Sequence, residues 1–250
     1  MKLRKKLLTC FLIGLFVSTI QAQVRLISAT KISIDARYDS MLNKSMSGVL
    51  ASYKARLGKD ITRPIGECDQ FMTVMTPEGL LSDFLADQLL LKACQLSREG
   101  VDLSVINLGS IRAPLKKGIL TVTDIYKVMP FENELVILEL KGSDIWSVFK
   151  SIARTGGAGV SNVNLEIKGN KINKLLINGE SVDNDKLYRV ATMDYLADGN
   201  SGMTAFLHAL KRVDTGLKVR DVFIEQIEKL TAQGKKVDAR LDGRIKLISE

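Results

Sequence analysis

The chain has 250 residues, of which 46% are hydrophobic and 26% are charged. These values are typical of globular proteins and exclude a disordered or collagen-like chain, and the length suits one large domain or two small ones. The formal net charge of +8 falls to +4 without the four basic residues among the first six positions, which is compatible with anionic ligands and predicts no nucleic-acid partner.

The N-terminus has the pattern of an export signal. A basic start precedes the apolar run Leu7–Ile20, and the small residue Ala22 follows. Residues 1–22 are therefore predicted to be a signal peptide, with a mature chain that begins near Gln23 and is periplasmic or secreted. An uncleaved anchor is the alternative, but the run is shorter than the ~20 residues of a spanning helix, so we expect no stable membrane insertion.

Two cysteines, Cys68 and Cys94, remain after the predicted signal peptide. An oxidising compartment would permit a disulfide between them. Two free buried thiols fit the sequence equally well, because unpaired cysteines are common in protein cores.

The predicted elements begin with a strand over Val24–Asp35 and an amphipathic helix over Arg37–Leu57. Gly58 is the predicted end of that helix. We assign residues 23–60 as the N-terminal strand and helix of the same domain as residues 61–250.

An extended segment, Thr62–Met75, is predicted next. Thr76 is suited to cap a helix, Pro77 to its first position, and Glu78 to its first turn, where the helix dipole favours an acid. We expect this helix to end within 98–100.

Short strands and helices then alternate irregularly. Strands are predicted at Val101–Ile106, Leu135–Leu140, Asn164–Lys168, Lys174–Ile177, Tyr188–Met193 and Arg244–Ile248. Helices are predicted at Thr123–Met129, Ser143–Ala153 and Val222–Ala232, with a turn at Asn178-Gly179. The lack of a strict strand–helix alternation predicts an α+β fold, a single domain with a mixed β-sheet packed with helices.

The residue inventory argues against self-sufficient catalysis. The one histidine, His208, is predicted to be a partly buried structural residue. A Ser-His-Asp or Cys-His site would have to use it, and two-metal phosphoesterase centres recruit several histidines and carboxylates. No nucleophile elbow, phosphate-binding loop, dinucleotide fingerprint or zinc-type cysteine pair is present. We therefore predict no catalytic residue and no metal or cofactor bound by this chain.

Three loops nevertheless have the composition of ligand-binding segments. In the first, Asn107 to Arg112, Gly109 would allow positive φ or a close approach of ligand to backbone, and Arg112 could hold a phosphate by two hydrogen bonds. An ordinary strand-to-loop turn is the alternative. The second carries Phe131 behind a proline, and the third runs from Tyr195 to Gly202. Taken singly, Phe131 is more often a core residue than a platform for a ligand, and the third loop is an unremarkable turn.

Together and in this order, the loops resemble the C-terminal domain of the 5'-nucleotidase family, from about Ile61 to Ile248. Asn107–Arg112 resembles the family's N-G-G-G-I-R, and Gly118–Asn133 its G-x-[IL]-T…[IV]-x-P-F-x-N. Tyr195–Met203 resembles F-L-A-x-G-G-D-G-[FY], and Glu78–Asp87 resembles E-S-x-L-G-N-L-x-A-D.

The resemblance implies a nucleoside or nucleotide site. Phe131 and Tyr195 would sandwich the base, a contact worth ~1–3 kcal/mol per base. Asn107 and Asn133 would hydrogen-bond the base, and Arg112 would face the ribose-phosphate side.

The chain departs from the family pattern at several positions. Ser201 replaces an aspartate that grips ribose hydroxyls, with Asp198 as a candidate to compensate. Met75 stands near the place of an arginine, and Leu108 and Ser110 replace two motif glycines.

In the family a separate domain carries two metals. We therefore expect a nucleotide-recognition component that works with a separately encoded metallophosphatase holding the divalent metals, in nucleotide catabolism. The alternative is a non-catalytic exported nucleoside-binding protein. A self-sufficient hydrolase is disfavoured by the single histidine.

Overall fold

The computed structural model describes residues 44–249. Residues from Tyr53 onward form one compact unit, and those up to Ser52 form another. The predicted signal peptide and the predicted strand Val24–Asp35 lie outside the described residues. The helix that follows is described as α2 (Lys44–Ile61), which continues past Gly58. The end predicted at Gly58 is therefore wrong, because a helix tolerates one glycine at a cost of only ~1 kcal/mol.

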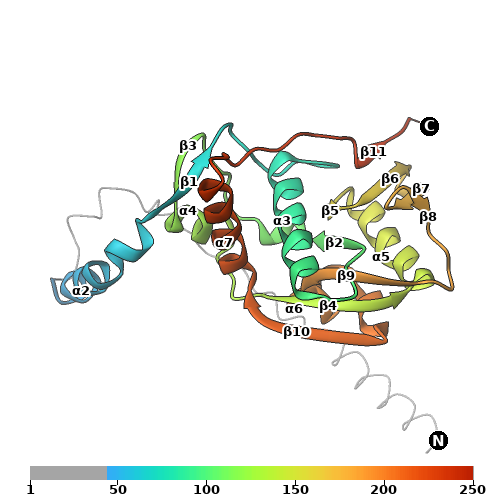
Figure 1. The fold of residues 1–250 in the computed structure, drawn as a ribbon, viewed down its shortest axis with the longest axis horizontal. Coiled ribbons are helices and arrows are strands. Elements are labelled where there is room, and N and C mark those ends of the chain that lie inside the picture. The colour runs from blue at the N-terminus through green and yellow to red at the C-terminus, as the bar shows by residue number, and fades with distance from the viewer. Residues whose placement is uncertain (1–43, 250) are drawn as a thin grey trace, which may run out of the picture. The chain divides into compact units, whose positions relative to one another are not determined.

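Figure 1 shows a large sheet at the centre of residues 53–250. Its strands are β2 (Leu103–Ile106), β4 (Glu134–Lys141), β5 (Gly159–Ser161), β9 (Leu187–Met193) and β10 (Lys211–Lys218). Their order is β10-β4-β9-β2-β5. The β9–β2 pair is parallel and the other pairs are antiparallel, so the predicted α+β fold with a mixed sheet is confirmed.

Two strands of this sheet were not predicted. β5 has three residues, too few for a recognisable alternation. β10 lies at the edge of the sheet and is largely exposed and rich in charge. Edge strands are often charged because this prevents pairing with other chains, so their sequences resemble loops.

Two smaller sheets complete the fold. One joins β11 (Ile245–Leu247), β6 (Val163–Lys168), β7 (Lys171–Ile177) and β8 (Glu180–Ser181), and the other pairs β1 (Pro64–Cys68) with β3 (Gly118–Thr121). The predicted turn at Asn178-Gly179 connects β7 to β8, with both residues at positive φ.

Helices cover the large sheet. Helix α3 (Leu80–Leu96) packs against β2, β5 and helix α7 (Val219–Ala232), and α5 (Gly142–Thr155) packs between β4 and β7. The shorter helices are α4 (Val122–Val128) and α6 (Asp194–Ala197), with 3-10 turns at Leu108–Ser110, Asn200–Gly202 and Thr204–His208. No helix in the described part of the chain is both long and apolar enough to cross a bilayer.

The start of α3 differs from the prediction. Its N-cap is Gly79, and Thr76 and Pro77 lie before the helix in a tight turn. The chain doubles back there, since a Cβ on Gly79 would lie 2.5 Å from the amide nitrogen of Met75. Glycine is required by this close approach, and the capping preference of threonine is overridden.

Both described cysteines are free thiols. Cys68 is fully buried, and its thiol donates to the carbonyl oxygen of Gln70 at 3.0 Å. Burial raises the pKa of this thiol, whereas Cys94 is exposed. Of the two alternatives that the sequence left open, the structure shows the unpaired one.

A buried acidic residue ties the C-terminal strand to α3. The Glu78 carboxylate accepts the backbone N–H groups of Asp242 and Gly243 at 2.9 and 3.0 Å. These bonds fix the turn that leads into β11, so the far end of the chain depends on a residue just before α3. Glu78 precedes the N-cap Gly79, so its predicted place in the first turn of the helix is wrong.

Arg244 completes this connection. Its guanidinium donates to Asp87, to Asp242 and to the carbonyl oxygen of Val160, over 2.8–3.2 Å. Its donors are thereby used, and Asp83 receives only a 3.7 Å approach from Nε. The Asp83 carboxyl is 1% exposed and has no hydrogen-bond donor among the described residues. Burial, reinforced by Glu78, raises its pKa to about 8 against the pull of Arg244.

This raised pKa predicts a specific pH dependence of stability. The folded state keeps Asp83 protonated up to pH about 8, whereas the unfolded state loses that proton near 3.8. Between these values the folded state binds more protons, so this group's contribution to the free energy of unfolding falls as pH rises, by at most about 1.4 kcal/mol per pH unit. We expect urea unfolding at pH 5 to 9 to show that the free energy of unfolding of Asp83→Asn increases, relative to that of the wild type, as pH rises. A constant difference would contradict the assignment.

The junction of β4 and α5 supplies a second prediction. A Cβ on Gly142 would lie 1.8 Å from the carbonyl oxygen of Asp183. Gly142→Ala should destabilise the fold by about 1–3 kcal/mol, as overpacking does, although alanine favours helices. The matched control is Gly58→Ala in α2, where no atom of the described residues outside the helix's own backbone lies within 4 Å of the added Cβ, and stability should be unchanged or higher. Equal urea midpoints for the two variants would refute the steric argument.

Candidate functional site

Three segments that are distant in sequence meet at one end of the large sheet. β2 and β9 are parallel neighbours, so Asn107 and Asp194, which follow them, lie at the same edge. β4 is antiparallel to β9 with Leu135 opposite Met193, which brings the start of β4, preceded by Asn133, to that edge too. Strand order and direction therefore place the three predicted loops together.

The loops enclose a cavity of about 300 Å³. This volume is at the lower end of the range for small-molecule pockets. Its lining contains all seven residues predicted from the sequence: Asn107, Gly109, Arg112, Phe131, Asn133, Tyr195 and Ser201. Ser110 lines it as well and was not predicted, because it entered the sequence comparison only as a replaced glycine.

Asn107 connects the first loop to the third. Its Oδ1 accepts the Ser110 hydroxyl at 2.6 Å, and its Nδ2 lies 3.5 Å from the Ser201 Oγ as a weak donor. The side-chain amide is thereby held facing the cavity. Gly109 does not have positive φ, so of its two predicted uses only close approach of a ligand is compatible with the structure.

Two half-exposed aromatic side chains line the cavity. Phe131 is 43% exposed and Tyr195 is 42% exposed, so Phe131 is not the core residue that was the alternative for its loop. The guanidinium of Arg112 lies 5.8 Å from the centroid of the Phe131 ring, within the range of a cation–π contact. Arg112 is anchored further by its Nη1, which donates to the carbonyl oxygen of Gly109 at 3.2 Å.

The third loop is shaped by residues with left-handed backbone. Gly199, Ser201 and Gly202 have φ of 81°, 55° and 77°. Asn200 donates to the carbonyl oxygen of Tyr195 at 2.9 Å, which closes the loop against its own start. Ser201 therefore adopts a conformation that is uncommon for a residue with a side chain, and this brings its hydroxyl to the cavity.

Asp198 does not take the place of the missing aspartate. Its carboxylate pairs with Arg212 at 2.6 Å, and it is not among the residues that line the cavity. The compensation suggested from the sequence is therefore wrong. Arg112 is the only charged residue in the described lining, so the cavity has a positive bias and contains no carboxylate or imidazole to act as a general base.

Three other residues considered from the sequence lie outside the cavity. Met75 is 59% exposed and does not line it, and Glu78 serves the β11 turn instead. His208 was expected to be partly buried, but its side chain is 66% exposed and its Nδ1 lies 2.8 Å from Asp144. It projects from a single 3-10 turn, where the apolar neighbours that suggested burial are themselves exposed.

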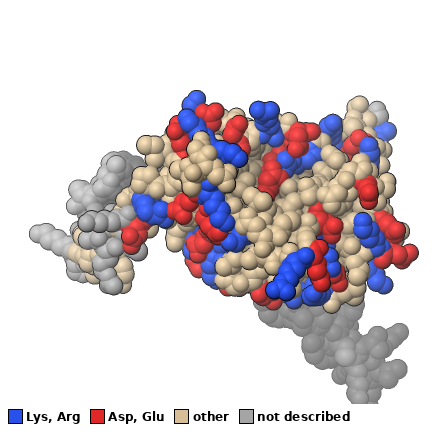
Figure 2. Space-filling model, viewed as in Figure 1, with Lys and Arg blue, Asp and Glu red and all other residues tan. Residues whose placement is uncertain are grey.

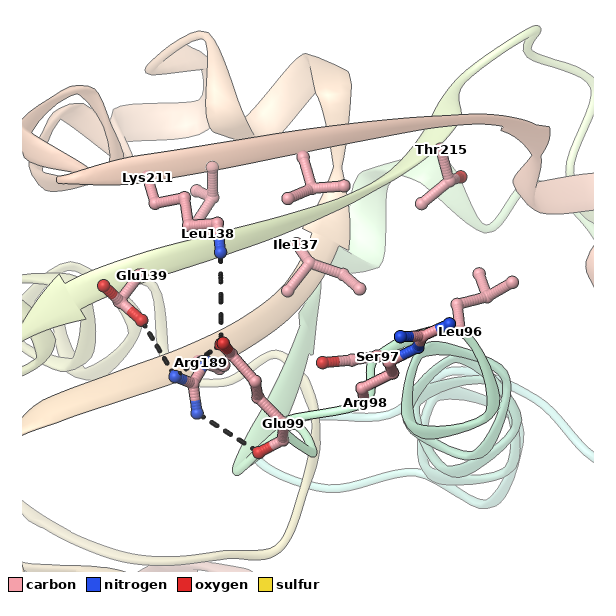
Figure 3. Close-up of a pocket in the computed structure, with 11 residues that line it drawn as sticks. Leu96, Ser97, Arg98, Glu99, Ile137, Leu138, Glu139, Arg189, Lys211 and Thr215 are labelled. Atoms are coloured by element: carbon pink, nitrogen blue, oxygen red, sulfur yellow. Dashed lines mark hydrogen bonds and ion pairs between the residues drawn. The ribbon is translucent and has the colours of Figure 1, made fainter.

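A different cavity, of about 270 Å³, lies over β4, β9 and β10 beside the end of α3 (Figure 3). Four of its five charged lining residues, all except Arg98, pair with one another. Arg189 is 2.7 Å from Glu99 and 3.2 Å from Glu139, and Lys211 is 4.0 Å from Glu99 (Figure 3). These side chains satisfy one another, so this cavity offers less to a polar ligand than the cavity at the end of the sheet.

Carboxylate oxygens of Glu78, Asp83 and Asp242 lie within 4.8 Å of one another, a spacing that a cation could use. The neighbours disfavour one. Glu78 already accepts backbone N–H groups, and Arg244 holds Asp242 and approaches Asp83. The guanidinium of Arg244 already supplies a positive charge to this cluster, and a protonated Asp83 needs no metal ion to balance it.

The face shown in Figure 2 intersperses acidic and basic side chains. Many charged side chains of the described residues are paired, for example Arg212 with Asp198 and Lys236 with Glu67. The charge on this face is therefore mixed, and the local positive bias at the candidate site comes from Arg112.

Comparison with known proteins gives a consistent result. Residues 61–208 match the model of the 5'-nucleotidase C-terminal domain. The chain is 32% identical to the trifunctional nucleotide phosphoesterase protein YfkN of Bacillus subtilis over 69% of this chain and 13% of that protein, and 28% identical to protein UshA of Escherichia coli over 82% and 36%. A crystal structure of a 5'-nucleotidase precursor from Thermus thermophilus superposes with a TM-score of 0.73 at 27% identity, over 82% of this chain and 43% of that one.

The chain thus spans less than half the length of these relatives. The family match, the fold and the order of the motifs all indicate the same family. The chain belongs to the 5'-nucleotidase C-terminal domain family.

Proposed function

We propose that the chain binds the nucleoside part of a nucleotide in the cavity at the end of the large sheet. The observation that carries this proposal is the meeting of Phe131 and Tyr195, both half exposed, in one cavity with two asparagine amides. Aromatic faces stack on any base, and amides can pair with base edges. Arg112 would lie on the phosphate side, since it is the one charge in the lining.

We further infer that the chain is the recognition component of an exported 5'-nucleotidase-type phosphohydrolase in nucleotide catabolism. A two-metal centre needs several histidine and carboxylate ligands, and this sequence has one histidine, which is exposed and does not line the cavity. The divalent metals and the hydrolytic step would come from a separate metallophosphatase. The signal peptide predicted over residues 1–22 would place this chain in the periplasm or outside the cell. The metallophosphatase would have to be exported to the same compartment.

A non-catalytic nucleoside-binding protein is the second candidate. Ser201 favours it, because a neutral hydroxyl replaces the carboxylate that the family motif offers to ribose, and Asp198 is occupied by Arg212. The two candidates differ in one observable: a recognition component should support phosphate release from AMP when its metallophosphatase is added, and a binding protein should not. Metal-dependent release by the purified chain alone would contradict both.

The base-stacking assignment is tested by calorimetric titration with adenosine. Phe131→Ala and Tyr195→Ala should each raise the Kd about 10- to 100-fold, which corresponds to the loss of ~1–3 kcal/mol of stacking. Phe71→Ala is the matched control, because Phe71 is 56% exposed and does not line the cavity. If wild-type protein binds adenosine and the three variants bind it equally, the site lies elsewhere.

The phosphate assignment is tested by comparing AMP with adenosine. Arg112→Met should weaken AMP about tenfold or more, the usual loss for a charge-assisted hydrogen bond. Adenosine should be affected less, because it lacks the phosphate. The preference of wild-type protein for AMP should also shrink as salt is raised. An equal loss of affinity for both ligands would instead mean that Arg112 acts by supporting Phe131, whose ring centroid lies 5.8 Å from its guanidinium.

A further inference from the structure

The loop that carries Phe131 and Asn133 is short. It runs from the end of α4 at Val128 to the start of β4 at Glu134. Phe131 projects from it half exposed, so few contacts of its own ring fix its position. Its placement in the cavity must therefore depend on what holds the neighbouring residues.

The junction of β10 and α7 holds these neighbours at three successive positions. Arg220 pairs with Glu132 at 2.6 Å, and Lys218 pairs with Glu134 at 2.9 Å. Between them, the backbone N–H of Val219 donates to the carbonyl oxygen of Asn133 at 2.9 Å. The segment 132–134 is thus attached to residues that lie more than 80 positions later in the chain.

Arg220 is the buried member of this set. Its side chain is 7% exposed, whereas that of Glu132 is 68% exposed. The guanidinium carbon lies 3.9 Å from the centroid of the Tyr126 ring in α4. Arg220 thereby connects α4, which ends just before the loop, with the residue that follows Phe131.

This arrangement is not explained by stability. The Nε of Arg220 has no hydrogen-bond partner among the described residues, so burying the guanidinium leaves a donor unsatisfied. Its two carboxylate partners are both exposed, Glu132 at 2.6 Å and Asp221 at 3.9 Å. A buried charge with exposed partners contributes little to folding compared with an apolar side chain of similar size. The guanidinium is planar, so it can stack on Tyr126 of α4 and bind Glu132 in the loop in a fixed geometry. An apolar side chain cannot do both.

We propose that Arg220 is a positioning residue for the nucleoside site, which holds Phe131 and Asn133 in place by stacking on Tyr126 and binding Glu132. This inference rests on the proposed function. Arg220 does not line the cavity and acts on the ligand only through the loop.

The test uses adenosine titration together with hydrogen–deuterium exchange of residues 130–134 in the ligand-free protein. Arg220→Met keeps the apolar bulk and removes the fork of donors, and it leaves no buried partner uncompensated, because Glu132 is exposed. We expect the Kd for adenosine and the amide exchange rates of the loop to rise about tenfold, a loss of ~1.4 kcal/mol. The urea midpoint should change little.

Three further variants separate positioning from general stabilisation. Glu132→Gln changes an exposed side chain and keeps its size. It should weaken binding as Arg220→Met does, and the double variant should be no worse than either. Arg220→Lys should restore part of the affinity, since a lysine keeps the charge but not the planar stack. Arg63→Met is the matched control. Arg63 pairs with Glu228, which lies on α7 as Arg220 does, but this pair includes no residue of the loop.

The outcomes distinguish this inference from the function on which it rests. If the wild type binds adenosine but Arg220→Met and Glu132→Gln bind it equally well, the positioning role is overturned. If the wild type binds neither adenosine nor AMP, the proposed function fails, and loop exchange still decides whether Arg220 holds the loop. Exchange that is unchanged in Arg220→Met would overturn the inference in either case.

Discussion

The position of β9 between β4 and β2 is the constraint on which the candidate site depends. β9 is parallel to β2 and antiparallel to β4, so the residues after β2, after β9 and before β4 are brought to one edge of the sheet. Any other strand order would separate Asn107, Asn133 and Tyr195. The site is thus a consequence of hydrogen-bond pairing in the core, and the loops need only present their side chains.

Charged residues elsewhere fix the surroundings of this edge. On one side Arg244 and Glu78 attach the last strand to α3, and on the other Arg220 attaches the start of α7 to the loop of Phe131. In both places a buried arginine joins segments that are distant in sequence. Such groups contribute more to a single geometry than to the free energy of folding, since desolvation offsets much of the attraction between charges.

The cavity combines recognition elements without catalytic ones. Its aromatic faces, amides, hydroxyls and one guanidinium can bind a planar, hydrogen-bonding, anionic ligand. None of its described lining residues is an acid or a histidine, so proton transfer and metal binding would require groups from elsewhere. This chemistry fits a member of the 5'-nucleotidase C-terminal domain family that spans less than half of its relatives.

The sequence by itself determined the α+β class, the family and the residues around the cavity, because four motifs in fixed order carry that information locally. Short-range patterns also located most helices and buried strands. They failed at β10, whose charged edge lacks alternation, and at Thr76, where a close backbone approach outweighed capping preference. Only the tertiary structure decided that Asp198 is occupied by Arg212, that Asp83 is buried without a donor, and that Arg220 reaches Glu132. These contacts join residues set side by side by strand pairing and helix packing, which no local pattern records.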